Sequence, residues 1–131
     1  MKKDPKELIS IITQTIYDKK GFKILALDVK GISTITDYII VAEGNVDRHV
    51  IAIAKAVEEE LKKYGETPCY IEGMCNGDWI VMDYLDIMVH LFMPGLRDKY
   101  QLERLWSEGK LLELNFVLHD ATNVSFSQTD A

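Results

Sequence analysis

Residues 77–92, GDWIVMDYLDIMVHLF, form two apolar runs in which Asp83, Asp86 and His90 are embedded. Branched, aromatic and other apolar side chains dominate both runs, and this composition over a few positions predicts two β-strands. The interval between the runs is short, which predicts an antiparallel hairpin with Tyr84 and Leu85 as a two-residue turn. The length of this turn decides which side chains meet across the hairpin.

The two faces of the predicted hairpin differ in chemistry, because successive side chains of a strand point to opposite sides. With a two-residue turn, one face holds three cross-strand pairs: Asp83 with Asp86, Val81 with Met88, and Trp79 with His90. The other face is apolar and is expected to form the core: Ile80, Met82, Ile87, Val89 and Leu91. Neither Tyr84 nor Leu85 is a preferred residue for such a turn, and a longer loop would change the pairing.

The segments around the hairpin predict further helices and strands. Apolar residues at helical spacing indicate a first helix from Pro5 to Gly21 and a second one between Asn45 and Gly65. Strands are expected over residues 23–29, 38–42 and 69–72, and a last short helix over residues 97–106. The strand–helix–strand order predicts one α/β domain over residues 1–131, with a mixed sheet of about five strands and helices packed on it.

The composition is that of a globular domain. A chain of 131 residues with 47% hydrophobic residues can bury a single core. The mean hydropathy is -0.05 and no apolar run reaches 18 residues, so no membrane-spanning helix is expected. Cys69 and Cys75 are the two cysteines and do not form a CxxC motif, which favours a reducing compartment and a cytoplasmic location.

Charge is unevenly distributed along the chain. Residues 1–30 contain seven lysines and four acidic residues (+3), and residues 31–131 contain eight Lys or Arg and seventeen acidic residues (-9), which gives the net charge of -6. Phosphate backbones would repel such an acidic body, which argues against DNA as a partner. A basic protein is the favoured partner, because complementary potentials accelerate encounter and suppress wrong pairings.

Asp83, Asp86 and His90 admit several interpretations. Asp and His are suitable metal ligands and the D-x-x-D-x-x-x-H spacing is compact, but no second cluster of His or Cys lies nearby in sequence. Two close carboxylates also suit acid–base catalysis, although no phosphate loop or nucleophile motif accompanies them. The same residues can be ordinary turn and strand-edge positions. The remaining interpretation is a docking surface, in which this acidic end of the hairpin, with Trp79 and Tyr84, binds a basic partner.

Longer motifs extend over most of the chain. They are TDYIIVAEGNVDRHVIAIAKAVEEELKKYG (residues 36–65), Glu72-Gly73 ahead of Trp79, DYLDIMVHLF (residues 83–92) and the pattern R-x-x-Y-x-L-E-x-L-W (residues 97–106). Together they resemble the ribosomal silencing factor family, also called Iojap, from about Leu8 to Leu112. The residues that match the family's motifs are Asp37, Gly44, Asn45 and Arg48, then Trp79, Asp83, Asp86 and His90, and finally Arg97, Tyr100, Leu102, Glu103, Leu105 and Trp106.

The resemblance implies a function and a set of binding residues. It implies a protein that is not an enzyme, uses no cofactor or metal, and binds the large ribosomal subunit through the fourteenth large-subunit ribosomal protein. Bound there, it would block the joining of the small subunit and repress translation. The residues expected to bind the partner are Trp79, Asp83, Tyr84, Asp86, Met88 and His90. Four more are expected either to bind the partner or to anchor the last helix on the core: Arg97, Tyr100, Glu103 and Trp106.

Three positions depart from the family's usual residues: Leu85 stands in place of Gly, Glu43 in place of Ser or Thr, and Val46 in place of Ser or Asn. The family's kinship with nucleotidyltransferases leaves a metal-dependent enzyme using Asp83 and Asp86 as the alternative, although the chain contains no Gly-Ser dipeptide to begin a phosphate loop. A homodimer through a sheet edge and a peripheral contact of the N-terminal lysines with ribosomal RNA are also open. Residues 115–131 lie outside the resemblance and are expected to form a flexible tail.

Overall fold

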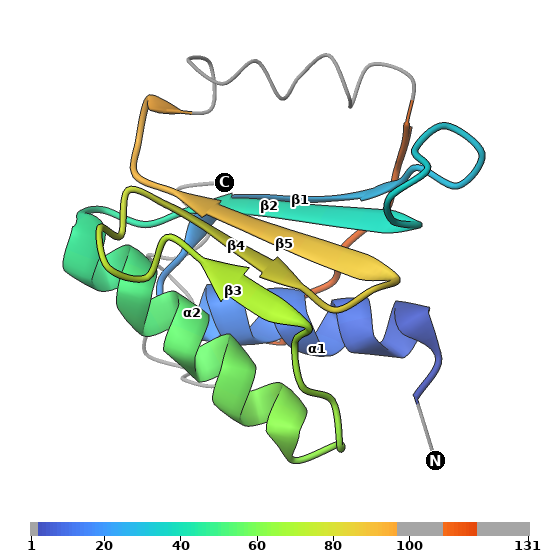
Figure 1. The fold of residues 1–131 in the computed structure, drawn as a ribbon, viewed down its shortest axis with the longest axis horizontal. Helices are drawn as coiled ribbons and strands as arrows, with labels where there is room; N and C mark the ends of the chain where they lie inside the picture. The colour runs from blue at the N-terminus through green and yellow to red at the C-terminus, as the bar shows by residue number, and fades with distance from the viewer. Residues whose placement is uncertain (1–2, 97–108, 118–131) are drawn as a thin grey trace.

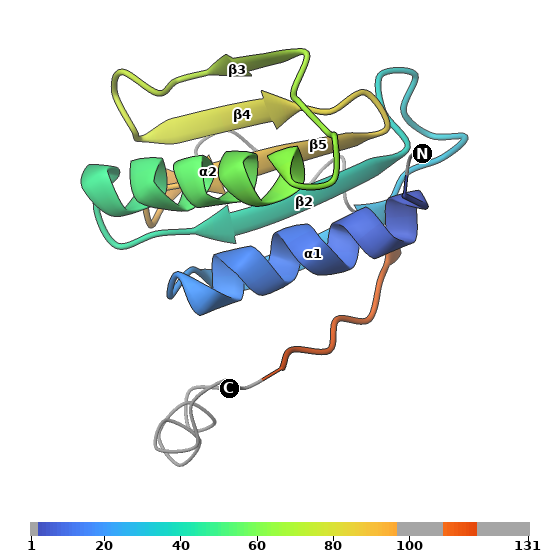
Figure 2. The same cartoon turned by 90° about the horizontal axis from the view of Figure 1, so that it is seen from below.

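A computed structural model describes residues 3–96 and 109–117. Their elements are, in chain order, α1 (Pro5–Asp18), β1 (Phe22–Asp28), β2 (Tyr38–Glu43), α2 (Asp47–Lys62), β3 (Tyr70–Glu72), β4 (Trp79–Asp83), β5 (Ile87–Phe92) and β6 (Lys110–Leu111). The strands form one sheet of six in the order β3-β4-β5-β2-β1-β6. Both helices lie on the same face of this sheet (Figures 1 and 2). The predicted mixed α/β sheet with helices packed on it is confirmed, and β6 is a strand that the sequence analysis missed.

Both helices bury the faces that their apolar spacing predicts. In α1, Leu8, Ile12 and Ile16 recur every four residues and are buried. Pro5 lies in the first turn of α1, where the N–H that proline lacks would have no partner within the helix. Helix α2 begins after Val46, whose side chain offers no acceptor to the first turn, and the N–H of Arg48 donates to Oδ1 of Asp47 instead (2.7 Å). Its buried residues are Val50, Ile53, Ala54, Val57 and Leu61.

Strand β2 lies at the centre of the sheet and is buried along its whole length. It pairs in parallel with β5 and antiparallel with β1. The main core lies between the sheet and the helices, where Ile40, Met82 and Val89 have no exposed surface. A second apolar cluster lies on the opposite, helix-free face and consists of Leu27, Val29, Ile39, Val41 and Phe92. Burial on both faces explains why this strand is almost continuously apolar.

The hairpin of β4 and β5 has the predicted faces but a different register. Its pairs are Trp79 with Phe92, Ile80 with Leu91, Val81 with His90, Met82 with Val89, and Asp83 with Met88. The predicted turn at Tyr84 and Leu85 is therefore wrong: the N–H of Tyr84 donates to the carbonyl of Ile87 (2.9 Å), and the chain reverses one position later, at Leu85 and Asp86. A register shift of two residues keeps every side chain on its face, so the predicted apolar set still packs against the helices.

Residues 109–117, which we call the strap, connect the far edge of the sheet to α1. Strand β6 pairs antiparallel with β1, and two leucines after it pack against the main core. Phe116 stacks on Tyr17 with ring centroids 4.5 Å apart. The side-chain amide of Gln14 donates to the carbonyl of Val117 (2.9 Å) and accepts from its N–H (2.8 Å). Residues 115–117, expected to begin a flexible tail, are thus bound to α1.

Several expectations fall on other parts of the chain. The predicted helix over residues 97–106, with Arg97, Tyr100, Glu103 and Trp106, lies outside the described residues, as do residues 118–131 of the expected tail. Within the described ranges, neither α1 nor α2 combines the length and the hydropathy that crossing a membrane requires.

Candidate functional site

The turn between β4 and β5 is tight and strained. The N–H of Asp86 donates to the carbonyl of Tyr84 (3.0 Å), and Leu85 between them has a φ of 75°. This left-handed backbone brings the Cβ of a leucine close to its own carbonyl, at a cost of about 1–2 kcal/mol. Asp83 supports the turn, since its Oδ1 accepts the N–H of Leu85 at 2.8 Å. Glycine has no Cβ and would avoid the cost, so the departure at Leu85 destabilises the turn.

The helix-free face of the hairpin presents three of the expected docking residues. Trp79, Asp83 and Met88 lie on it and are partly exposed. Asp86 follows in the turn, where it is exposed. The predicted cross-strand pair of Asp83 with Asp86 does not form, because Met88 is the partner of Asp83. The two carboxylates instead belong to one end of the hairpin, three positions apart along the chain.

Strand β3 extends this face with two residues that the sequence analysis did not single out. Tyr70 pairs with Asp83 and Glu72 with Val81, so their side chains lie on the helix-free side. Both are exposed, Tyr70 to 46%. Alternation over residues 69–72 places these two side chains on one face of the strand, but only the pairing with β4 shows that this is the helix-free face.

His90 lies on the same face but is buried, with 8% of its surface exposed. Its Nδ1 accepts a hydrogen bond from the indole N–H of Trp79 at 3.2 Å, and the ring centroid of Phe92 lies 6.2 Å from that of His90. An indole N–H can only donate, so Nδ1 is unprotonated and the proton of the neutral ring is on Nε2. Burial lowers the pKa of His90 to about 4. His90 therefore orients Trp79 as a neutral acceptor and presents no charge to a partner at pH 7.

Tyr84 does not share this surface, and its expected position is wrong. Its side chain belongs to the main core on the helix side and is 8% exposed. Burial raises the pKa of the Tyr84 hydroxyl, and the nearby charges of Glu58 and Glu66 raise it further. The alternation of side chains along β4 predicts this position. Ile80 and Met82 face the helices, so the side chain of Tyr84, two positions further on, does as well.

This surface combines negative charge with apolar contact area. Across residues 3–96 and 109–117, no three His, Cys, Asp or Glu side chains gather closely enough to hold a metal ion. Asp83 accepts the backbone N–H of Leu85. Asp86 is exposed and offers negative charge, and the partly exposed Trp79 and Met88 offer apolar contact area. Carboxylates beside a thioether, on a face that also carries an aromatic ring, suit a basic protein surface.

Comparison with known proteins places the chain in a family. The family model described as "Ribosomal silencing factor during starvation" matches residues 2–131. The ribosomal silencing factor RsfS of Bacillus subtilis is 35% identical over 114 residues, which are 87% of this chain and 97% of that protein. A mouse protein, "Mitochondrial assembly of ribosomal large subunit protein 1", is 30% identical over 105 residues, covering 76% of this chain and 45% of its own length.

Solved structures agree with the sequence comparison. A crystal structure of a protein from Chromobacterium violaceum matches this fold with a TM-score of 0.77 at 30% identity, over 91% of this chain and 97% of that one. The expected kinship with nucleotidyltransferases stays a prediction. The family match over nearly the whole sequence, together with these relatives, shows that the chain belongs to the ribosomal silencing factor family.

Proposed function

We propose that this protein represses translation by binding the large ribosomal subunit through its fourteenth ribosomal protein, which blocks the joining of the small subunit. Membership of the ribosomal silencing factor family supports an action on the ribosome. The name of the mouse relative refers to assembly of the large subunit, which supports that subunit as the partner.

One observation carries the finer part of the proposal. Asp83 and Asp86 lie at one end of the hairpin, and the partly exposed indole of Trp79 lies on the same helix-free face at the other end of β4. Proteins that bind RNA carry Lys and Arg to neutralise phosphates, so a ribosomal protein offers a basic surface. A chain with a net charge of -6 is attracted to such a surface, and the indole held by His90 supplies a rigid aromatic contact.

The test is sedimentation of the purified protein with separated large subunits, small subunits and intact ribosomes. The wild type is expected to migrate with large subunits and to prevent their association with small subunits. The variant Asp83→Asn/Asp86→Lys should bind at least tenfold more weakly. Asn at position 83 retains an oxygen for the N–H of Leu85, so the turn is preserved while its charge is removed.

A matched control changes the same charge elsewhere. Glu59→Gln/Glu7→Lys also changes the net charge by +3, at exposed positions on the helices, and should bind like the wild type. Equal weakening of both variants would mean that only net charge matters, and the assignment of the hairpin end would be withdrawn. A folded wild type that binds no large subunits would overturn the proposed function.

A further inference from the structure

Three exposed aliphatic residues lie at the end of the sheet where β2 and β5 begin. Ile32 and Ile35, in the loop of residues 29–37, are 43% and 73% exposed, and Leu85 in the turn is 60% exposed. The N–H groups of Asp37, the last residue of the loop, and Tyr38, the first residue of β2, donate to the carbonyl of Asp86 (3.1 and 2.9 Å). These bonds hold the loop beside the turn, at one end of the sheet in Figure 2. We call Ile32, Ile35 and Leu85 the aliphatic tip.

The loop holds its shape through its own hydrogen bonds, and these leave its isoleucines in solvent. The N–H groups of Ile32 and Ser33 both donate to the carbonyl of Val29 (3.0 and 2.9 Å). The hydroxyl oxygen of Ser33 in turn accepts the N–H groups of Ile35 (3.1 Å) and Thr36 (3.4 Å). The backbone around both isoleucines is therefore ordered before any partner arrives.

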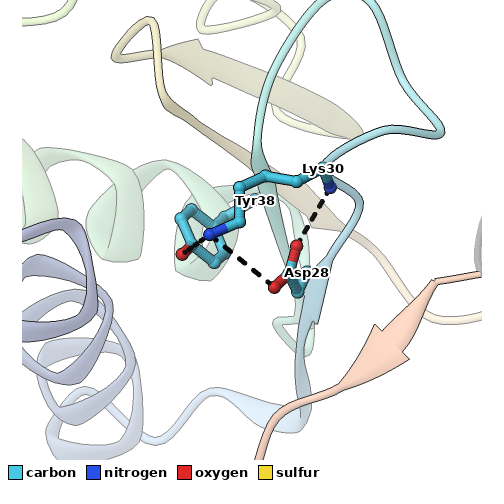
Figure 3. A network of polar contacts seen from close by, with 3 residues as sticks. All are labelled: Asp28, Lys30 and Tyr38. Carbon is cyan, nitrogen blue, oxygen red and sulfur yellow. Dashed lines mark hydrogen bonds and ion pairs between the residues drawn. The ribbon is translucent and has the colours of Figure 1, made fainter.

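Lys30 fixes the start of this loop, as Figure 3 shows. Its ammonium donates to the hydroxyl of Tyr38 (2.9 Å) and lies 5.0 Å from the centre of that ring. Its backbone N–H donates to Oδ1 of Asp28 (2.9 Å), and its ammonium is 4.0 Å from Oδ2. The hydrogen bond with Tyr38, followed by the charge of Asp28, raises the pKa of Lys30. The one lysine of the loop is thus directed back to β1 and β2.

Exposed aliphatic side chains on ordered backbone are characteristic of contact surfaces. Two separate segments converge here, and one of them holds Leu85 in a strained left-handed conformation, a feature that concentrates at functional sites. A preordered loop loses little conformational entropy on binding, so the apolar area it buries contributes more of its free energy to affinity.

We infer that the aliphatic tip docks onto a basic protein surface, where apolar groups of the partner cover the tip and its Lys or Arg side chains pair with the surrounding carboxylates. Those carboxylates are Asp37, Asp83 and Asp86. The inference rests on the proposed function, since the occupant is the same large-subunit protein. Two observations support that occupant: its charge complements the carboxylates, and the tip is continuous with the proposed interface through Asp83 and Asp86.

The experiment measures the affinity of single variants for purified large subunits by sedimentation. Ile35→Ser and Leu85→Asn each remove an exposed aliphatic side chain, and Asn tolerates the left-handed backbone at position 85. Each is expected to weaken binding by about tenfold, the effect of losing part of one buried aliphatic side chain. Val46→Ser is the matched control, because Val46 is 46% exposed at the opposite end of β2. It should bind within about twofold of the wild type.

The outcomes separate this inference from the proposed function. If Asp83→Asn/Asp86→Lys loses binding while both tip variants bind like the wild type, the tip makes no contact and the proposed function stands. If the wild type itself does not bind large subunits, both fall together. If the tip variants instead convert a wild-type dimer into a monomer in equilibrium sedimentation and keep their ribosome affinity, the tip joins two copies of this chain and the inference is overturned.

Discussion

His90 should make the fold lose stability as the pH falls below 6.5. Burial lowers its pKa from 6.5 to about 4 in the folded protein. Its cross-strand neighbours are Val41 and Val81, so no charged residue is paired with it to favour the imidazolium. Protonation of Nδ1 would also break the hydrogen bond from Trp79. The unfolded chain therefore takes up a proton at a pH where the folded protein does not, and acid favours unfolding.

The size of the effect follows from the two pKa values. Above pH 6.5 the imidazole is neutral in both states and contributes no pH dependence. Each unit between 6.5 and about 4 costs close to 1.4 kcal/mol, and the loss is complete near pH 4. Between pH 7.5 and pH 4.5, His90 alone should lower the free energy of unfolding by about 2.5 kcal/mol.

The assay compares the wild type with His90→Gln by urea denaturation at half-unit pH steps from 7.5 to 4.5, at constant ionic strength. Gln does not titrate, and its amide oxygen can still accept the indole N–H of Trp79. Other carboxylates titrate in both proteins and cancel in the difference. The stability difference between the two proteins should therefore shift by about 2.5 kcal/mol over this range in favour of the variant.

Parallel stability curves for the wild type and His90→Gln would refute the reasoning, since they would mean that the imidazole titrates at the same pH in the folded and unfolded states. A second variant, His90→Phe, guards against an effect specific to glutamine and should show the same flattened pH dependence.

Three further substitutions test individual backbone positions by urea denaturation at pH 7.5. Val46→Ser should raise the free energy of unfolding by about 1 kcal/mol, because α2 has no side-chain cap and Val46 has the extended backbone of a capping residue; no gain would show that the first turn is satisfied otherwise. Leu85→Gly should raise it by about 0.5–1 kcal/mol, since relief of left-handed strain exceeds the added entropy of glycine. A destabilised variant would contradict that assignment of strain. Gly73→Ala should lower it by at least about 2 kcal/mol, because position 73 has a φ of 92° and the new Cβ would collide with the carbonyl oxygen of Trp79. An unchanged midpoint would show that the loop relaxes freely.

Local patterns in the sequence predict the helices and the faces of the hairpin. The recurrence of Leu8, Ile12 and Ile16 is sufficient to define the buried side of α1. Alternation likewise separates Trp79 from Ile80, whatever the turn length. In both cases the periodicity is a direct consequence of backbone geometry and needs no information about distant residues.

The register of the β4–β5 hairpin and the positions of the site residues could be determined only from the three-dimensional structure. A leucine at positive φ is uncommon, so the sequence does not indicate a turn at Leu85 and Asp86, which pairs Asp83 with Met88. Tyr84 was expected in the docking surface as an aromatic residue of the turn, although its place in the alternation indicates the core. The aliphatic tip depends on hydrogen bonds between the 29–37 loop and the β4–β5 turn, which are separated along the chain by α2 and β3.

The strap has a consequence for when this protein can fold during its own synthesis. Gln14 in α1 and Val117 are 103 positions apart, yet each supplies a hydrogen-bond partner to the other. Contacts of such high sequence separation form late and slowly, because a long loop must close first. Part of the surface of α1 therefore stays uncovered until residue 117 has left the ribosome.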